Sequence, residues 1–577
     1  MKHLLLTVVF VCFASGVSYA DNAIITQKMN RVLETASPEE PVSAWIYFTD
    51  KGTSLSKALA TVEANLTEKA LQRRLRNRPA DQLVDRYDVP VNAEYVRILR
   101  QNGVEIQHKS RWLNAVSATA KPAILNSLTS LQFIKKIDVI RYTKVPELVE
   151  AEIQPELQKS TKTTLLDYGS SLDQNVQITT NVMHDLGYSG AGVTVAMLDA
   201  GYNNLEHEAL QHLNITHTWD FVNGDENVDD EAGQMGTGSH GTYTLSTLAG
   251  YKPGNLIGPA YGATFLLAKT ENTDWEHNVE EDDWVAAAEW ADSLGADIIS
   301  SSLGYWDFDF GEPRQYTWED MDGNTAVVTI GADIAASRGI LVVNSAGNSG
   351  DVAEPANTIG APSDGDSVLA IGAVSSTGSL AGFSSRGPSA DGRIKPDVCA
   401  RGVSTVCASA FSQTGYAAVN GTSLSCPLVA GAAALVLEAN PGLTNMQIIE
   451  ALRSTADNAA TPDRDFGWGV IDTYAASNFL SGIGNTTNLP EKIELYPAFP
   501  NPFNPATTIN YALPEAENIE LSVFNLLGQR VAVLFKGQQS AGEYRQRWDA
   551  GNQPAGVYFI VLESGKTRQV QKAVLLK

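Results

Sequence analysis

Ser423 stands among small residues, in the segment Asn420–Pro427, directly before an apolar run from Val429 to Leu437. The run predicts a buried helix with Ser423 at its N-terminal end. At that end the helix dipole and the N–H groups without helical partners favour negative charge. A serine that attacks a carbonyl group creates such a charge, so this position suits a nucleophile. Alone, a small-residue turn before a helix is usually only a cap, and catalysis would need partners elsewhere in the chain.

Two other segments carry such partners. The β-branched run that begins at Val193 ends in Asp199, which predicts a buried parallel strand with Asp199 at its carboxyl edge, where sites form in open α/β sheets. His240 precedes a predicted helix over residues 243–249. A lone histidine there would serve as a cap or a packed side chain. Together with Ser423, however, these residues supply a nucleophile, a base and a group to orient the base.

Asn348 is a fourth candidate. Residues 339–345 predict a buried strand, and Asn348 lies in the glycine turn that follows it. Its side-chain amide could donate to an oxyanion, although an asparagine in a turn is also common without any such role.

The region from about residue 168 to 478 resembles the subtilisin-family serine proteases, or subtilases, through four blocks in the family's order. The blocks are Val195–Gly201, His240–Thr242, Ser345–Asn348 and Gly421–Ser423. The resemblance implies a parallel-sheet α/β fold in which Asp199, His240 and Ser423 form the triad and Asn348 lines the oxyanion hole. It also implies that the backbone of Ser302, Leu303 and Gly304 pairs with protein or peptide substrates. No cofactor or catalytic metal is expected.

Two positions depart from the family pattern. Tyr243 stands where subtilases usually have a second histidine, and Leu428 follows Pro427 where a histidine is usual. Neither position supplies a group of the triad. Two alternatives stay open: an inactive subtilase fold that serves as a surface binding or adhesion protein, and a Ser-Glu-Asp acid peptidase. His240 and the amide of Asn348 disfavour the acid peptidase.

Charge and composition limit the partners and the compartment. The 577-residue chain has a net charge of −25, which argues against nucleic acid or an anionic membrane as a partner. Residues 1–20 combine a basic head, a short apolar core and small residues before Asp21, which predicts a secretory signal peptide. No later segment is expected to be long and apolar enough for a transmembrane anchor. The protein should therefore be secreted, extracellular or on the cell surface.

The three cysteines after the signal peptide allow one disulfide. Cys399 and Cys407 are the closest pair in sequence, and the alternative is that they and Cys426 are buried thiols.

Two acidic stretches, residues 220–231 and 271–283, are compatible with structural calcium but lack an EF-hand spacing, so solvated acidic loops are the favoured interpretation. His207, His212 and His217 lack the spacing of a helical zinc motif.

Residues 21–160 differ in charge from the rest of the chain, with fifteen Lys or Arg and eight Asp or Glu between Lys57 and Arg141. Strands are predicted at 42–48, 104–106, 114–120 and 134–140, and helices at 59–75 and 121–131. This pattern resembles a subtilase pro-domain, which implies an α+β, ferredoxin-like unit that assists folding and then inhibits the enzyme. Opposite charges would attract it to an acidic protease domain at 161–482. The polar join at 145–164 should be exposed and cleavable.

The character of the chain changes again from residue 483. A polar linker at 484–488 precedes short alternating strands, which predict an all-β, Ig-like sandwich over 483–577. This part resembles a C-terminal sorting domain of type IX secretion, which implies the secretion machinery as a partner. The alternative is a generic module that binds substrate or the cell surface. The motifs that carry the resemblance are Tyr496–Pro505, Asn525–Gly528, Ala555–Tyr558 and Lys572–Lys577.

Overall fold

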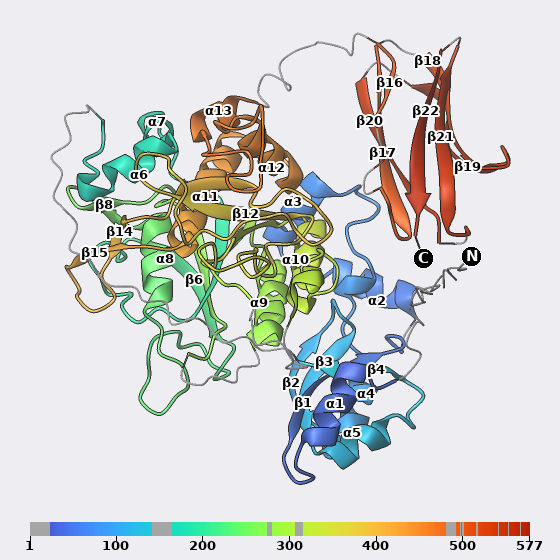
Figure 1. The fold of residues 1–577 in the computed structure, drawn as a ribbon, viewed down its shortest axis with the longest axis horizontal. Coiled ribbons are helices and arrows are strands. Elements are labelled where there is room, and N and C mark those ends of the chain that lie inside the picture. Colours follow the sequence, from blue (N-terminus) through green and yellow to red (C-terminus); the bar gives the residue numbers. More distant parts are fainter. Residues whose placement is uncertain are drawn as a thin grey trace, which may run out of the picture. The chain divides into compact units, whose positions relative to one another are not determined.

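The computed structural model describes residues 24–140, 164–273, 280–305, 316–479 and 492–576, apart from residue 53 and residues 497, 499–500, 515–516, 540–541, 552 and 566. The predicted signal peptide, nearly all of the join at 145–164 and the linker at 484–488 lie outside the described residues. The chain divides into two compact units, residues 1–479 and 480–577 (Figure 1).

A seven-stranded parallel sheet forms the centre of the first unit, in the strand order β13-β12-β11-β10-β5-β9-β6. The strands are β5 (Thr194–Asp199), β6 (Asn214–Asp220), β9 (Thr264–Lys269), β10 (Ile298–Ser301), β11 (Leu341–Ser345), β12 (Val368–Val374) and β13 (Val398–Arg401). The strand order reverses beside β5, with β9 and β6 on one side and β10 to β13 on the other. Ligand crevices of open α/β sheets form at the carboxyl ends of the strands at such a reversal.

Two pairs of helices pack against this sheet. Helix α8 (His240–Ala249) contacts α11 (Thr422–Ala439), and α11 also contacts β10 to β13. Helix α9 (Glu280–Leu294) contacts α10 (Val327–Ser337), and these two contact β5, β11 and β12. The remaining elements of this domain are α6 (Leu172–Gln177), α7 (Thr180–Asp185), α12 (Asn445–Ser454), α13 (Thr473–Phe479), two short 3₁₀ helices (Gly169–Ser171, Trp318–Asp320) and the strand pairs β7 (Tyr251–Lys252) with β8 (Leu256–Ile257) and β14 (Thr405–Ala408) with β15 (Tyr416–Val419).

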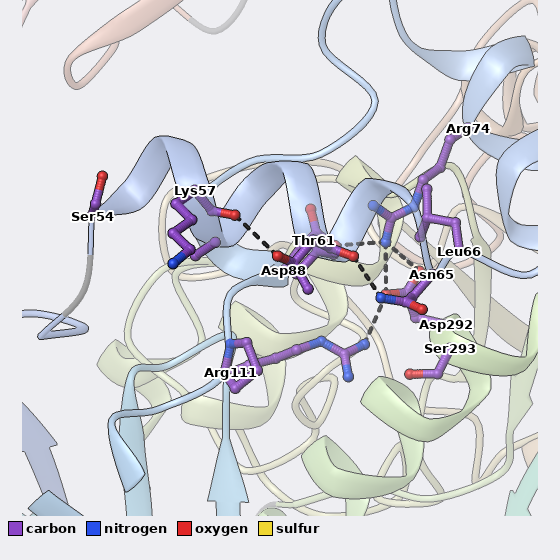
Figure 2. Close-up of a pocket in the computed structure, with 13 residues that line it drawn as sticks. Ser54, Lys57, Thr61, Asn65, Leu66, Arg74, Asp88, Arg111, Asp292 and Ser293 are labelled. Carbon is purple, nitrogen blue, oxygen red and sulfur yellow. Dashed lines mark hydrogen bonds and ion pairs between the residues drawn. The ribbon is translucent and has the colours of Figure 1, made fainter. Parts of the chain in front are cut away.

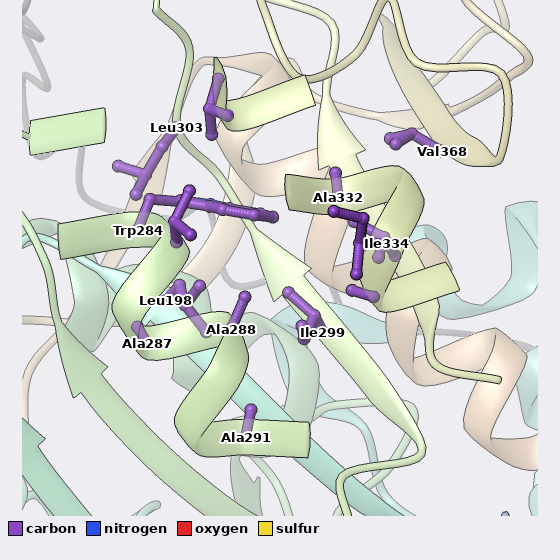
Figure 3. Close-up of a cluster of buried hydrophobic side chains, with 14 of the residues drawn as sticks. Leu198, Trp284, Ala287, Ala288, Ala291, Ile299, Leu303, Ala332, Ile334 and Val368 are labelled. Atoms are coloured by element: carbon purple, nitrogen blue, oxygen red, sulfur yellow. The ribbon is translucent and has the colours of Figure 1, made fainter. Parts of the chain in front are cut away.

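A large apolar cluster joins the sheet to α9 and α10 (Figure 3). Leu198 of β5 and Ile299 of β10 belong to this cluster, together with Trp284 of α9. Because successive side chains of a strand point to opposite faces, Asp199 points away from the cluster and toward the face where α8 packs. The alternation in β5 therefore decides which helix the carboxylate can reach.

Helix α11 corrects one expectation. By length and composition it could cross a membrane, with a mean hydropathy of 1.5, whereas no segment after the signal peptide was expected to do so. It is nevertheless 89% buried inside the protein. A helix that is apolar on all sides also suits the core of a large domain, and this is the place that α11 takes.

The pro-domain contains a four-stranded antiparallel sheet in the order β2-β3-β1-β4. Its elements are α1 (Gln27–Thr35), β1 (Val42–Phe48), α2 (Leu55–Glu63), α3 (Glu68–Asn77), a 3₁₀ helix (Arg86–Asp88), α4 (Ala93–Gln101), β2 (Glu105–Ser110), β3 (Ala115–Ala120), α5 (Pro122–Leu128) and β4 (Ile134–Val139). All four predicted strands are present. The predicted helix over 59–75 is instead two helices, because Thr67 caps a new helix by accepting a hydrogen bond from Ala70 N at 3.2 Å.

The second unit is all-β and consists of two antiparallel sheets, β16-β17-β20 and β19-β18-β21-β22. One apolar core includes Tyr511 of the first sheet and Leu521 and Ile560 of the second, which makes the unit a sandwich. The strands are β16 (Glu494–Leu495), β17 (Ala506–Leu513), β18 (Glu517–Asn525), β19 (Arg530–Gln539), β20 (Gly542–Asp549), β21 (Gly556–Ser564) and β22 (Thr567–Leu575).

Candidate active site

Asp199 and His240 are in direct contact at the carboxyl end of β5. His240 Nδ1 lies 2.5 Å from Asp199 Oδ1, and both side chains are buried. Asp199 also accepts hydrogen bonds from Ala200 N and from Thr244 Oγ1, each at 2.8 Å. The carboxylate is therefore held from several sides, and it can hold the imidazole in one orientation.

The close approach of α8 to the end of β5 depends on a glycine. A Cβ atom on Gly241 would lie 2.2 Å from the carbonyl oxygen of Gly201, in the turn after Asp199. Any larger residue would push the first turn of α8 away from β5. The His-Gly pair thus provides both the imidazole and the space that brings it to the carboxylate.

Ser423 is the second residue of α11 and is 3% exposed. Pro427 lies four residues further along the helix and has no N–H, so it cannot donate the usual helical hydrogen bond to the carbonyl of Ser423. Ser302 Oγ donates to this carbonyl instead, at 2.9 Å. In return, Ser423 Oγ makes a long hydrogen bond to Ser302 O at 3.4 Å. The proline and Ser302 together fix the serine at the positive end of α11.

Asn348, in the turn after β11, contacts the first turn of α11. Its Oδ1 accepts from Thr422 N and Thr422 Oγ1, each at 2.9 Å. A Cβ atom on Gly421 would lie 3.5 Å from its Nδ2. The oxygen of the amide is thus engaged by Thr422, and the NH₂ group lies beside the turn that carries Ser423.

Residues 302–304 continue directly from β10. Ser302 and Leu303 are buried, and Gly304 is exposed. Asn344 Nδ2 donates to Leu303 O at 2.9 Å, which ties this segment to the neighbouring β11. Their part in substrate binding stays a prediction.

The two residues that depart from the subtilase pattern are both packing positions. Tyr243 belongs to a small apolar cluster with Cys407 and Leu424, and Leu428 is fully buried in α11. A large aromatic side chain and an aliphatic one therefore fill the volume at these positions.

The cysteine alternatives resolve in favour of thiols. Cys399, Cys407 and Cys426 are buried and form no disulfide within the described part of the chain. Burial raises the pKa of Cys426 to about 12, so its thiol stays protonated and unreactive at neutral pH.

The histidines at 207, 212 and 217 do not form a site. His207 uses both ring nitrogens on the backbone: Nε2 lies 2.7 Å from Gly415 O, and Nδ1 accepts from Ala209 N at 3.0 Å. His212 and His217 are exposed.

In the first acidic stretch Asp220 pairs with Lys269 at 3.3 Å, while Asp225 to Glu231 are mainly exposed. Residues 274–279 of the second stretch lie outside the described residues.

Contacts between the pro-domain and the protease domain centre on α9, and sequence reasoning missed them. Glu289 accepts hydrogen bonds from Ser110 Oγ at 2.6 Å, from Arg111 N at 3.1 Å and from Trp112 N at 3.2 Å. One carboxylate thus engages three donors at the end of β2 and in the turn that follows it. Burial raises the pKa of Glu289. Its arginine and hydrogen-bond partners lower this pKa, but they offset the effect of burial only in part. The signal available in the sequence was a pair of acids, Glu289 and Asp292, one turn apart in a helix that is otherwise rich in alanine.

An arginine network surrounds Asp292, one turn further along α9, and Figure 2 shows two of its members, Arg74 and Arg111. Arg73 pairs with Asp292, Arg74 Nη2 donates to it at 2.9 Å, and Arg111 Nη2 donates at 2.9 Å. Burial alone would raise the pKa of Asp292, but the three guanidinium groups outweigh burial and hold this pKa well below its ordinary value. Beside this network, α2, α3 and α9 line a cavity of about 610 Å³. The predicted attraction between a basic pro-domain and acidic protease residues thus has specific partners.

Two sequence motifs of the second unit lie together. Asn501 Oδ1 accepts from Val574 N at 2.7 Å, and its Nδ2 donates to Lys572 O at 2.8 Å. Phe503 N donates to Val574 O at 2.8 Å, and Leu576 N donates to Phe503 O at 2.8 Å. The proline-asparagine segment therefore pairs with the last strand of the chain.

Three family models match this chain. The model of the subtilase family matches residues 190–469. The model of the peptidase S8 propeptide domain of Bacteroidota matches residues 43–158, and that of a secretion system C-terminal sorting domain matches residues 497–576.

Individual proteins are similar as well. Subtilisin E of Bacillus subtilis (strain 168) is 30% identical over 382 residues, which cover 66% of this chain and 85% of that protein. Subtilisin DY of Bacillus licheniformis is 34% identical over 292 residues, which cover 50% of this chain and 93% of that protein. The crystal structure of fervidolysin from Fervidobacterium pennivorans, a keratinolytic enzyme related to subtilisin, aligns with a TM-score of 0.55 at 19% identity and covers 91% of this chain and 70% of that one.

Proposed function

Because this chain belongs to the subtilase family, we propose that Ser423 is the nucleophile of its peptidase reaction and that Asp199 and His240 complete the triad. The protein is a secreted or cell-surface serine-type endopeptidase, and its catalysis needs no cofactor. The observation that carries the residue assignment is the 2.5 Å contact between His240 Nδ1 and Asp199 Oδ1. It lies at the reversal of the sheet, beside the helix that presents Ser423.

In this mechanism the hydroxyl of Ser423 attacks the scissile carbonyl while His240 accepts its proton. Asp199 orients the imidazole and stabilises the imidazolium that forms. His240 then returns the proton to the leaving amine as the C–N bond breaks, which leaves an ester on Ser423. A water molecule, activated by the same imidazole, hydrolyses the ester and restores the hydroxyl.

The developing oxyanion would receive hydrogen bonds from Asn348 Nδ2 and from the backbone N–H of Ser423. Both donors belong to a rigid framework, since Asn348 is fixed by Thr422 and Ser423 lies in the first turn of α11. An extended substrate would pair with the backbone at Ser302, Leu303 and Gly304 as an added strand.

The flanking domains would act before and around catalysis. We propose that residues 21–160 inhibit the enzyme until they are removed, which the buried contacts at Glu289 and Asp292 support. Residues 483–577 would direct export through type IX secretion. The pairing of Asn501 and Phe503 with the last strand joins the two sorting motifs within the same unit.

Covalent labelling tests the nucleophile. A fluorophosphonate probe should label the mature wild-type enzyme and the Ser425→Ala variant, but not Ser423→Ala. Ser425 is a matched control because it lies in the same helical turn and its hydroxyl donates to Thr422 O, at 2.9 Å. Label retained by Ser423→Ala would refute the assignment. An activity optimum near pH 4, about where carboxyl groups titrate, would instead favour the acid-peptidase alternative.

A further inference from the structure

One histidine and two aspartates meet at the junction of the pro-domain and the protease domain. His108 lies on β2, and Asp282 and Asp283 lie in the first turn of α9. His108 Nε2 is 2.5 Å from Asp283 Oδ1, and one ligand atom from each of the three residues lies within 4.8 Å of the others. A bulge in β2 between Ile106 and His108 shifts the strand register just before the histidine, and such bulges re-aim a side chain.

Asp282 is the unusual member of this cluster. It is 1% exposed, and neither of its carboxylate oxygens has a hydrogen-bond partner among the residues that the structure describes. The hydroxyl of Ser117 faces it without reaching hydrogen-bond geometry, and Ser117 Oγ accepts from His108 N at 3.1 Å. A buried carboxylate without a partner costs several kcal/mol, so something should satisfy its lone pairs.

Neighbouring groups have interactions of their own and do not supply that partner. Glu281 accepts hydrogen bonds from Trp45 Nε1 at 3.2 Å and from Tyr316 OH at 2.6 Å. Lys269 Nζ pairs with Asp220 at 3.3 Å and donates to two backbone carbonyls. The cluster itself therefore contains two carboxylates and a single imidazole.

A proton on Asp282 would remove its charge but would not satisfy the group. Neither oxygen of the carboxylate has a described donor, so the oxygen that stays unprotonated would still lack one. A cation, in contrast, binds the lone pairs of both aspartates and the imidazole directly.

We propose that His108, Asp282 and Asp283 bind a divalent transition-metal ion of the zinc class across this junction. Four-coordinate zinc has bonds of about 2.0–2.2 Å to nitrogen and oxygen, which places ligand atoms roughly 3.4 Å apart. The observed spacings, from 2.5 Å to within 4.8 Å, bracket this value, so small side-chain rotations suffice. Imidazole favours zinc over calcium or magnesium, and water would complete the coordination.

The ligands come from both sides of the junction, which gives the ion a structural consequence. With the pro-domain bound, all three ligands are present. Removal of the pro-domain takes His108 away and leaves two aspartates, a poorer zinc site. By linkage, an ion that prefers the assembled junction must stabilise that junction. The site is separate from the proposed triad, and it does not depend on the identity of the nucleophile.

The test uses the full chain with Ser423→Ala, checked on a gel to be uncleaved. The protein is incubated with ZnCl₂ and desalted, and bound zinc is measured by mass spectrometry. We expect about one retained zinc per chain and a rise in Tm on zinc addition. Adding His108→Gln or Asp282→Asn should abolish both effects, whereas adding His217→Gln, on an exposed histidine of β6, should change neither.

Three results would overturn the proposal. The first is a chain that retains no zinc and shows no shift in Tm. The second is retention that is equal in His108→Gln, Asp282→Asn and the parent chain. The third is a parent chain that binds no zinc together with an Asp282→Asn variant whose Tm is higher than that of the parent chain without zinc. This result would mean that Asp282 is a protonated carboxyl group rather than a metal ligand. Since every readout is binding or stability, failure here is distinct from failure of the proposed catalytic residues.

Discussion

Thr422 sets the direction of the Asn348 amide. Its N–H and its hydroxyl both engage Asn348 Oδ1, and its hydroxyl also accepts from Gly347 N at 3.2 Å. Because two donors hold the oxygen of this amide, its orientation is fixed. Its NH₂ group lies beside the turn that carries Ser423. A residue next to the proposed nucleophile thus prepares the proposed oxyanion donor before any substrate binds.

Asn348→Ala should lower kcat by about 10²–10³, the loss that removal of one oxyanion-hole donor typically causes, with little change in KM. The amide would act mainly in the transition state, so substrate binding should be spared. Steady-state kinetics on a peptide substrate measures both constants. Thr422→Val, which keeps the backbone N–H and loses only the hydroxyl, should cause a smaller fall in kcat. A change confined to KM would remove Asn348 from the oxyanion site.

At the scale of elements, α3 of the pro-domain and α9 of the protease domain form a charged contact that is shielded from solvent. Arg73 is fully buried, pairs with Asp292 and donates to Ala296 O at 2.6 Å and to Arg338 O at 3.1 Å. Buried ion pairs are costly to break on one side only, because the remaining charge stays without a partner. The contact should therefore respond strongly to single substitutions.

Arg73→Ala in a separate pro-domain should weaken its inhibition of the mature enzyme by about 10²–10⁴-fold, corresponding to about 3–5 kcal/mol for one lost partner of a buried pair. The inhibition constant of each pro-domain variant, determined from activity at several pro-domain concentrations, measures this loss of inhibition. Arg97→Ala is the matched control, since Arg97 pairs with Glu94 on the exposed face of α4 and its loss should leave inhibition unchanged. Equal inhibition by both variants would contradict the assigned contact.

Acid should loosen the same junction. Burial would raise the pKa of Asp85, but Arg338, the backbone N–H of Tyr87 and Arg78 outweigh it and lower this pKa from 3.8 to about 2. A lowered carboxyl pKa contributes stability that is present above the ordinary pKa and is lost as the pH falls toward the lowered one.

Binding of the pro-domain to the Ser423→Ala protease domain should accordingly weaken between pH 4 and pH 2, values set by the ordinary and lowered pKa of Asp85. Analytical gel filtration across this range measures the bound fraction. Arg338→Gln removes the main partner of Asp85 from the protease side, so its binding should be weaker at pH 6 and should fall less steeply with acid. A fall of equal steepness in both proteins would exclude Asp85 from this effect.

At the scale of the whole molecule, the C-terminal unit has a core of its own. The sandwich core around Tyr511 contains only residues of that unit, whereas the protease cluster around Trp284 also includes Trp112 of the pro-domain. The proposed catalytic residues all precede residue 480, where the second unit begins. Separate cores predict that one unit can be removed without unfolding another.

Deletion of residues 484–577 should leave peptidase activity intact and stop export. The catalytic unit keeps its core, while the pairing of the proline-asparagine segment with the last strand is lost. Activity is measured in the medium and in cell fractions of a host with type IX secretion, for the full and the truncated chain. Normal export of the truncated chain would refute the sorting role, and an inactive purified truncated enzyme would refute the modular boundary.

The sequence by itself determined the features that depend on local pattern. Apolar runs with β-branched residues predicted β5 and β11, and an apolar stretch after Ser423 predicted α11. The order of four short motifs indicated the family. Each motif lies at the end of a strand or the start of a helix, so it could be recognised from local pattern. The helices α1 and α4 were missed, since their apolar positions are few and their stability comes from packing on the pro-domain sheet.

Only the tertiary structure decided which distant groups meet. The contact of His240 with Asp199, the donors around Glu289, the arginines at Asp292 and the cluster of His108 with Asp282 all join residues from different elements. No local pattern encodes such contacts, because they depend on strand order, helix packing and the docking of one domain on another. The same reason applies to the cysteines: sequence spacing left a disulfide open, whereas their places on separate strands and in α11 bury them as thiols.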